Sequence, residues 1–334
     1  MVIKSQHVIF YFSGTGNGLK AALTIARRLE NEEALNGLAL GAERAAQEHS
    51  MQGMAQAIRA GVHAGGAVPV IDLANKADDP TEASAPTEPL TDVRVVCMGP
   101  DEPFAFEGPC RSIGFVYPCH FGTMPQRVRE FASALDLSGQ TGAYRYAVVT
   151  YGGGVKNPAL AELNSLLAKK GCPLDYSNAV KAFSTYVILY KMSEKVTEKT
   201  ARFKYGLEFI VDDVCARRKT PTVRTGAFDS LYTRLAMKNC GRDEDRHFVV
   251  SESCDGCSVC AAVCPVDNIR IEGGRPAWLH RCEQCLGCLH LCPRVAIDFG
   301  AKTKGRGRYK HPEVTVHMLI AYNNNHPETL GHRY

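Results

Sequence analysis

The sequence predicts two folded parts: an α/β domain with a doubly wound parallel sheet, then a small α+β domain rich in cysteine. In the first half, short apolar strands end in Gly- or Pro-containing loops that each lead into a helix. In the second half, eight of the fourteen cysteines fall within 39 residues. The length of 334 residues is enough for two modest domains at roughly 150 residues each.

The composition is that of a folded globular protein, with 45% hydrophobic and 22% charged residues. The chain has no apolar run long enough to span a membrane and no signal-peptide pattern, so we expect a cytoplasmic protein with reduced cysteines. The net charge of +4 lies in residues 301–334, which hold six Lys or Arg and two Asp or Glu. The neutral remainder argues against a nucleic-acid binder.

The eight clustered cysteines form two equal runs at an offset of 28 residues. Each run has the spacing Cys-x2-Cys-x2-Cys-x3-Cys-Pro, and an apolar β-type segment follows it, at 268–271 and at 296–299. The runs comprise Cys254, Cys257, Cys260, Cys264 and Cys282, Cys285, Cys288, Cys292. Zinc prefers two cysteine pairs per site, whereas three thiolates from one loop and a fourth from elsewhere suit a cubane cluster.

Residues 254–299 therefore resemble a bacterial two-cluster 4Fe–4S ferredoxin. In that family the fourth cysteine of each run serves the other cluster. The resemblance implies one cluster on Cys254, Cys257, Cys260 and Cys292, and a second on Cys282, Cys285, Cys288 and Cys264.

A possible anion site follows the first strand. The apolar run His7–Phe12 leads into Ser13-Gly14-Thr15-Gly16-Asn17-Gly18 and then into a helix at 19–29. Such a loop offers backbone N–H groups and hydroxyls to an anion at a helix N-terminus. The loop lacks the lysine of a nucleoside-triphosphate site, so a monophosphate fits it better.

Two later segments repeat the order of strand, loop and helix. Ser112–Pro118 leads into Cys119–Pro125 and a helix at Gln126–Leu135, and Tyr146–Tyr151 leads into Gly152–Gly154 and a helix at Pro158–Lys169. The carboxyl ends of parallel strands meet at one edge of a sheet, where ligands bind. The three loops are thus expected to form one site.

This set resembles the flavodoxin fold, and the resemblance implies bound FMN. The phosphate would be held by Ser13, Gly14, Thr15, Gly16, Asn17 and Gly18. The ring would be flanked by Tyr117, Pro118, Cys119, His120, Phe121, Gly122, Thr150, Tyr151, Gly152, Gly153 and Gly154, with Tyr117, Phe121 and Tyr151 as stacking candidates. The family usually has Thr where this chain has Gly18, which is expected to weaken FMN binding by roughly 1 kcal/mol.

The remaining segments complete the predicted organisation. The α/β domain spans 1–190, with a second strand at Val68–Leu73, an inserted segment at 31–66 and a linker-like segment at 75–92. Val93–Met98 is expected to be an added strand, and 174–190 to supply a fifth strand and a loop across the flavin site. A helical connector at 191–244 (helices at Ser193–Arg218 and Phe228–Lys238), the ferredoxin domain at 245–300 and a basic tail at 301–334 follow.

Three side chains near these motifs invite a ligand or catalytic role, and we assign them none. His290 lies between cysteines that already complete the ligand pattern, so a packing or hydrogen-bonding role is expected. Cys119 and His120 are interpreted as packing in a flavin loop. The basic tail is expected to lie across its own protein, with docking to an acidic redox partner and nucleic-acid binding as less favoured alternatives.

Taken together, the parts resemble the EFR-type ferrodoxins, which are flavodoxin–ferredoxin fusions. The resemblance implies electron transfer between two 4Fe–4S clusters and FMN, in an anaerobic, reducing cytoplasm. The partner would be a redox protein or a small-molecule donor or acceptor. The alternatives are an FMN-dependent reductase of a small molecule fed by the clusters, and a cluster scaffold without flavin. The oligomeric state is left open.

Overall fold

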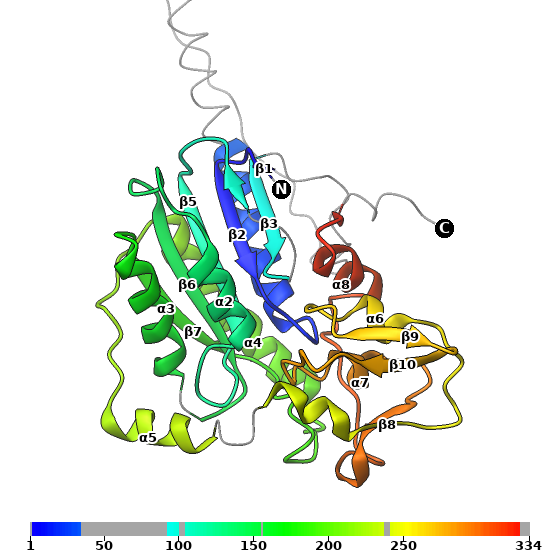
Figure 1. Cartoon of the computed structure of the whole chain (residues 1–334). Coiled ribbons are helices and arrows are strands. Elements are labelled where there is room, and N and C mark those ends of the chain that lie inside the picture. Colours follow the sequence, from blue (N-terminus) through cyan, green and yellow to red (C-terminus); the bar gives the residue numbers. More distant parts are fainter. Residues whose placement is uncertain (1, 35–91, 100–103, 155, 237–240, 328–334) are drawn as a thin grey trace, which may run out of the picture.

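A five-stranded parallel sheet with helices on both faces packs beside a smaller part that holds both cysteine runs (Figure 1). The structure is a computed structural model that describes residues 2–34, 92–99, 104–154, 156–236 and 241–327. The predicted strand at Val68–Leu73 and the linker-like segment lie outside these residues, as does the predicted insertion beyond residue 34. No helix among the described residues is long and apolar enough to cross a membrane.

Within the described residues, the sheet confirms the predicted strands of the first half. Its spatial order is β3 (Val93–Cys97), β2 (His7–Tyr11), β5 (Ser112–Pro118), β6 (Tyr144–Tyr151) and β7 (Tyr176–Lys181), with every neighbouring pair parallel. This is the order 2-1-3-4-5 of the main strands along the chain, consistent with a flavodoxin-like α/β fold. The segment expected as an added strand, Val93–Cys97, takes the place beside β2. A separate short ribbon pairs β1 (Val2–Ile3) with β4 (Ala105–Phe106).

Helices of the described chain cover both faces of the sheet. The helix at 17–34 shares one core with α4 (Val196–Cys215), through side chains such as Leu19 and Phe203. On the other face, α2 (Gln126–Ala134) and α3 (Asn157–Lys169) share a core with alternate residues of the strands. Thus α4, which lies within the predicted connector, packs on the sheet, while α5 (Ala227–Ala236) lies beside α3.

The cysteine-rich part is built from two small antiparallel ribbons. Strand β8 (Phe248–Val250), which follows the 3-10 helix η2 (Arg242–His247), pairs with β11 (Ile297–Phe299), and β9 (Ile269–Glu272) pairs with β10 (Arg275–Trp278). Both β-type segments expected after the cysteine runs are confirmed as β9 and β11. Each of the short helices α6 (Val259–Ala262) and α7 (Gly287–Leu291) follows the first two cysteines of its run and contains the third.

The C-terminal segment runs back across the sheet domain. After the 3-10 helix η3 (Gly300–Lys302), the chain leads to α8 (Val316–Asn323), which packs against β3. The side chains of Met318, Leu319 and Tyr322 enter the same core as α4 and the helix at 17–34. The backbone N–H of Cys97 at the end of β3 donates to the Asn325 side chain over 2.7 Å. The expectation that the tail lies across its own protein is confirmed for the described residues.

Candidate functional site at the junction of the two parts

A cavity of about 520 Å³ lies at the carboxyl ends of the sheet strands. It is formed where the loops after β2, β5 and β6 meet, as expected for a doubly wound sheet. Fifteen of the seventeen residues predicted for the FMN site line it. They are Ser13, Gly14, Thr15, Asn17, Gly18, Pro118, Cys119, His120, Phe121, Gly122, Thr150, Tyr151, Gly152, Gly153 and Gly154. The two that do not line it are Gly16 and Tyr117.

Tyr117 points away from the cavity because adjacent side chains of a strand face opposite sides of the sheet. Its side chain is fully buried in the core beneath α2 and α3, and its hydroxyl donates to the Ala159 carbonyl over 3.0 Å. Tyr117 therefore does not lie where a ring in the cavity can stack on it. Phe121 and Tyr151, the other stacking candidates, do line the cavity.

The loop at 13–18 has the features of an anion-binding turn. The Gly16 N–H donates to the Ser13 hydroxyl over 3.1 Å, and Gly16 has a φ of 99°, which favours glycine. The helix at 17–34 begins directly after it, and the first backbone N–H groups of a helix have no intrahelical acceptor. These groups and the positive end of the helix dipole suit a phosphate in the cavity.

Gly18, where the related pattern has Thr, is enforced by the local backbone. A Cβ at this position would lie 2.5 Å from the Phe12 carbonyl oxygen. No side chain fits there without moving the end of β2, so the loop is closed more tightly than a threonine permits. The expected loss of affinity for FMN stays a prediction.

Cys119 and His120 form the start of the second cavity loop. Burial raises the pKa of the Cys119 thiol to about 11 and lowers the pKa of His120 to about 4, so both side chains are neutral at pH 7. A hairpin-like bridge joins His120 to Thr123 through two backbone hydrogen bonds, with Phe121 and Gly122 at positive φ. Both residues line the cavity. Two neutral side chains in a closed turn agree with the packing role expected for them.

The loop at 182–190 closes a further side of the cavity. It follows β7, which lies within the range expected to give the fifth strand and the covering loop. Tyr186, Leu189 and Tyr190 contribute to the lining, and the Tyr186 ring meets the Phe121 ring edge-on at 5.0 Å between centroids. The helix α5 adds Tyr232.

The second cysteine run supplies the part of the cavity that sequence reasoning missed. Gln284, Cys285 and Leu286 line the cavity, and Cys285 packs against the loop after β2. A Cβ built on Gly14 would lie 2.7 Å from the Cys285 Cβ and 2.8 Å from its Sγ. The glycine therefore permits contact between the two parts. Only the spacing of the cysteines was visible in the sequence, and it carries no signal of this contact.

The C-terminal segment at 303–315, here called the strap, holds the same loop from outside. The Tyr309 hydroxyl donates to Asn17 Oδ1 over 2.9 Å, and the Asn17 amide donates to the Phe183 carbonyl over 3.2 Å. The rings of Tyr309 and Phe183 stack with centroids 4.4 Å apart. The His311 N–H donates to the Thr15 carbonyl over 3.0 Å. The Asn17 side chain thus joins the loop to the strap and to Phe183.

His290 joins the strap to the second cysteine run. The Tyr309 N–H donates to His290 Nδ1 over 3.1 Å, and His290 Nε2 lies 2.7 Å from the Thr185 carbonyl, to which it donates as the protonated nitrogen. Burial lowers the pKa of His290 to about 4, so the ring is neutral. The hydrogen-bonding role expected from the sequence is confirmed.

The structure brings the first predicted set of four cysteines together. Cys254, Cys257, Cys260 and Cys292 line one small pocket in the cysteine-rich part. Cys292 comes from the other run, so the chain crosses between runs as the resemblance implies. Cys257 is exposed, which places this set at the surface.

The second set lies deeper. Cys264, from the first run, lies near the first three cysteines of the second run. Its negative charge, when ionised, raises the pKa of Cys282, Cys285 and Cys288. Burial is the main cause that raises the pKa of Cys285 to about 12, and that of Cys260 in the first set to about 11. Such thiols give up their protons when iron binds. Within the described residues, no three His, Cys, Asp or Glu side chains are placed to hold a single metal ion.

The offset of 28 residues in the sequence reappears in the backbone around the sulfurs. The N–H groups of Asn268 and Ala296 donate to Cys264 Sγ and Cys292 Sγ, each over 3.3 Å. Ser258 and Leu286, also 28 residues apart, both adopt left-handed conformations before the short helices. Hydrogen bonds to the sulfurs are one means by which proteins tune cluster potentials.

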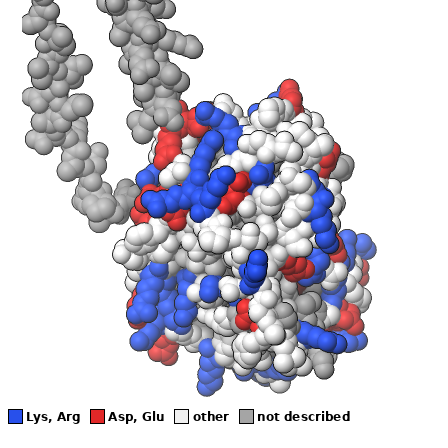
Figure 2. Space-filling view, turned by 90° about the vertical axis from the view of Figure 1, so that its left-hand side faces the viewer, with Lys and Arg blue, Asp and Glu red and all other residues white. Residues whose placement is uncertain are grey.

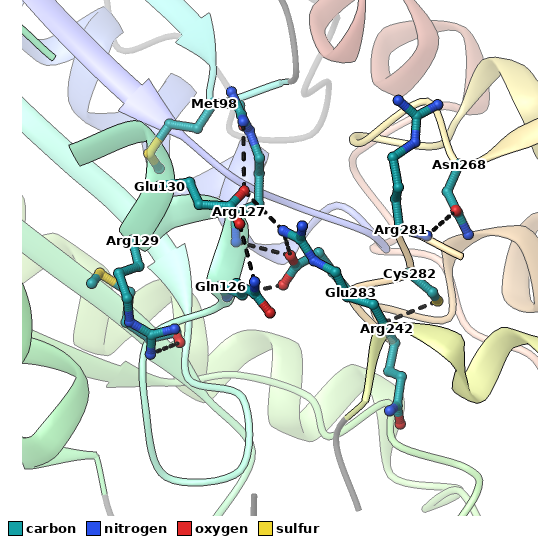
Figure 3. Close-up of polar contacts among 12 residues, drawn as sticks. Met98, Gln126, Arg127, Arg129, Glu130, Arg242, Asn268, Arg281, Cys282 and Glu283 are labelled. Atoms are coloured by element: carbon teal, nitrogen blue, oxygen red, sulfur yellow. Dashed lines mark hydrogen bonds and ion pairs between the residues drawn. The ribbon is translucent and has the colours of Figure 1, made fainter. Parts of the chain in front are cut away.

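A buried carboxylate fixes the cysteine-rich part to the sheet domain (Figure 3). The Glu283 carboxylate accepts hydrogen bonds from the Gln126 and Arg127 N–H groups, over 3.0 and 2.8 Å, at the start of α2. Arg242 bridges Glu283 and Glu130, at 3.2 and 2.8 Å. Burial raises the pKa of Glu283, and the Arg242 guanidinium opposes that rise. A residue of the second cysteine run thus caps a helix of the other domain.

Comparison with known proteins identifies one of these parts. Residues 247–270, which contain the first cysteine run, match the family of the 4Fe–4S binding domain. The chain therefore has an iron–sulfur domain of the ferredoxin type, which binds at least one 4Fe–4S cluster and serves electron transfer. No curated protein and no solved structure matches the chain.

Proposed function

We propose that the protein transfers electrons internally between two 4Fe–4S clusters and an FMN bound in the cavity at the junction. The observation that carries the proposal is the position of Cys285. It belongs to the second cysteine set, it lines the cavity, and it packs against Gly14 of the anion-binding loop. A cluster on the second set would thus lie next to the phosphate end of the flavin site.

The residues of the cavity suit FMN. Its phosphate would meet the backbone N–H groups of the loop at 13–18, and the ring would lie between the loops that begin at Cys119 and Gly152, near Phe121 and Tyr151. When bound, FMN accepts or gives one or two electrons, which matches it to clusters that each carry one. The chain positions the group and keeps neutral side chains around it.

The two cysteine sets would give the route its order. The first set, with exposed Cys257, lies at the surface, and the second lies between it and the cavity. Cys260 of the first set and Cys288 of the second are close enough for one to raise the pKa of the other. We therefore assign the order outer cluster, inner cluster, flavin.

Cofactor content after anaerobic purification tests the proposal. We expect about eight Fe and one FMN per chain, with FMN re-binding after its removal. Iron without flavin binding would leave a cluster scaffold, and stoichiometric zinc with fewer than about four Fe would contradict the cluster assignment.

The crossing of ligands has its own test. Cys292→Ala should perturb the electron paramagnetic resonance signal of the outer cluster, since Cys292 lines the pocket with Cys254, Cys257 and Cys260. A loss confined to the inner cluster would refute the crossed assignment. Cys172→Ala, at a buried cysteine of the sheet domain, is the matched control and should leave both signals unchanged.

A further inference from the structure

Large apolar side chains gather in the open at the mouth of the cavity. Of the eleven exposed large hydrophobic residues in the described chain, six either line the cavity or lie on α5, the helix that contributes Tyr232 to it, and we call them the mouth patch. They are Leu189, Tyr190, Phe228, Leu231, Tyr232 and Leu235. Leu189, Tyr190 and Tyr232 also line the cavity. Exposed apolar side chains concentrated at one place mark interaction sites.

The helix α5 is oriented opposite to an ordinary surface helix. Phe228, Leu231, Tyr232 and Leu235 have the spacing of one helical face, and that face is open to solvent, with Phe228 74% exposed. Its polar side turns toward the sheet domain instead. The Thr233 hydroxyl donates to the Gly122 carbonyl over 3.4 Å, and Thr233 and Arg234 line a groove against α3. The apolar face is therefore left for something outside the described chain.

The surroundings of the mouth are basic. Lys181 ends β7 directly before the cavity-lining loop, Lys191 follows Tyr190, and the Lys156 ammonium lies 5.0 Å from the centre of the Tyr151 ring. In the part of the chain that the structure describes, no carboxylate lies within ion-pair distance of these three lysines. Figure 2, which faces the left-hand side of Figure 1, shows Lys and Arg in several separate groups around uncharged surface.

The charge pattern favours a protein over a membrane as the occupant. A helix that lies in an anionic membrane surface has a polar face rich in Lys and Arg. The charged residues of α5 are Asp229 and Arg234, which cancel. The lysines instead stand around a cavity mouth that contains two tyrosines, a residue type enriched where proteins bind each other tightly. An apolar centre with a charged rim is the usual anatomy of a protein interface.

We propose that the mouth patch is the docking site of an acidic electron-transfer protein, which exchanges electrons with the flavin end of the chain. The inference rests on the proposed function, because FMN in the cavity would place its ring behind Tyr190 and Tyr232. The partner carries carboxylates that face Lys156, Lys181 and Lys191, and an apolar centre that covers α5. Electrons then have two separate points of access, the exposed first cysteine set and the mouth patch.

The test uses the full chain, purified anaerobically, and two acidic probes: a two-iron ferredoxin and a flavodoxin. Binding is measured by calorimetry at low and high salt. The wild type should bind at least one probe, more weakly as salt rises. Phe228→Ser with Leu231→Ser should weaken binding about tenfold or more, as should Lys181→Glu with Lys191→Glu. Neither pair lines the cavity, so iron and FMN content should stay unchanged.

The matched control is Tyr205→Ser with Phe209→Ser, which removes an exposed aromatic pair on α4 and should leave binding as it is. Equal binding by the wild type and the α5 variant, or no binding to either probe, would overturn the proposal. The proposal would also be overturned if the wild type sedimented with phosphatidylglycerol vesicles and the α5 variant did not. Flavin content, measured on the same samples, separates the two proposals. Binding that depends on the mouth patch in a protein without FMN would contradict the proposed electron route but would support the docking site.

Discussion

At the scale of single residues, two glycines define the junction. Gly18 leaves no room for a side chain beside the Phe12 carbonyl, and Gly14 leaves none beside Cys285. The sequence showed both only as members of a flexible, phosphate-type loop. Their structural reasons differ, because one shapes the loop itself and the other lets a second domain approach it.

We expect Gly14→Ala to disturb both cofactor sites at once. The added methyl group would meet the Cys285 side chain at 2.7 Å, and such overpacking costs about 1–3 kcal/mol. The melting temperature should fall, and iron and FMN content should fall together. Gly142→Ala is the control, since a Cβ there has open space around it and the residue lies outside the cavity lining. A normal cofactor content in Gly14→Ala would show that the contact with Cys285 is dispensable.

At the scale of elements, the contacts between the two parts rely on a helix cap and on the strap. Glu283 reaches across from the second cysteine run to the first N–H groups of α2, which has no side-chain cap of its own. The strap lies over the loop at 13–18 and is fixed by Tyr309, His311 and Glu313.

Replacing Glu283, which caps α2 from the other domain, should lower the free energy of unfolding more than replacing Glu130 of the same network. Glu283→Ala removes two charge-assisted hydrogen bonds and leaves Arg242 with Glu130 alone, so we expect the free energy of unfolding to fall by about 2 kcal/mol. Glu130→Ala, in a more exposed residue of the same network, should cost less than about 1 kcal/mol. Urea denaturation measures both. Equal losses would mean that Glu283 acts only through Arg242.

The strap should respond to acid. Burial opposes ionisation of Glu313, but hydrogen bonds from Lys20 and Lys204 outweigh it and lower the pKa to about 2. An acid whose pKa is lower in the folded state adds stability above its unfolded pKa, and this is lost as pH falls toward the folded value. The wild type should therefore be more stable than Glu313→Gln at pH 7, and the difference should shrink between about pH 4.5 and about 2. Thermal unfolding of both proteins across this range checks it, and a difference that stays constant would contradict it.

The sequence was informative about elements whose signals are local. Strands such as His7–Tyr11, the loops after them and both cysteine runs could be predicted because composition and spacing within one segment determine them. The pairing of Val93–Cys97 with β2 could not, since two β-type segments competed for that place. The contacts of Cys285 and Tyr309 with the first loop were also hidden. They join positions hundreds of residues apart, and such contacts leave no trace in a single sequence.

At the scale of the whole molecule, the cavity belongs to neither domain alone. Its walls come from the sheet loops, from α5 and from the second cysteine run, while the strap supports it from outside. The binding of iron and of FMN should therefore be coupled, although the two groups would touch different residues.

Removal of iron tests this coupling. A chelator applied under reducing conditions should release the cysteine runs from their fixed geometry, and Cys285 and Leu286 would then no longer form a fixed cavity wall. The dissociation constant for FMN, followed by flavin fluorescence, should rise about tenfold, and restored iron should reverse the change. An FMN affinity that is independent of iron would show that the sheet loops alone define the site.

The different depths of the two cysteine sets also have a consequence for damage by air. Cys257 lies at the surface, whereas Cys285 lies beneath the loop at 13–18. Oxygen and peroxide reach an exposed cluster first, so a cluster on the first cysteine set would be the one most easily damaged. Oxidation should proceed from the surface inward and pass through a state that retains the inner cluster and the flavin. Brief exposure to air should thus stop electron entry at the first cysteine set before it affects the flavin site.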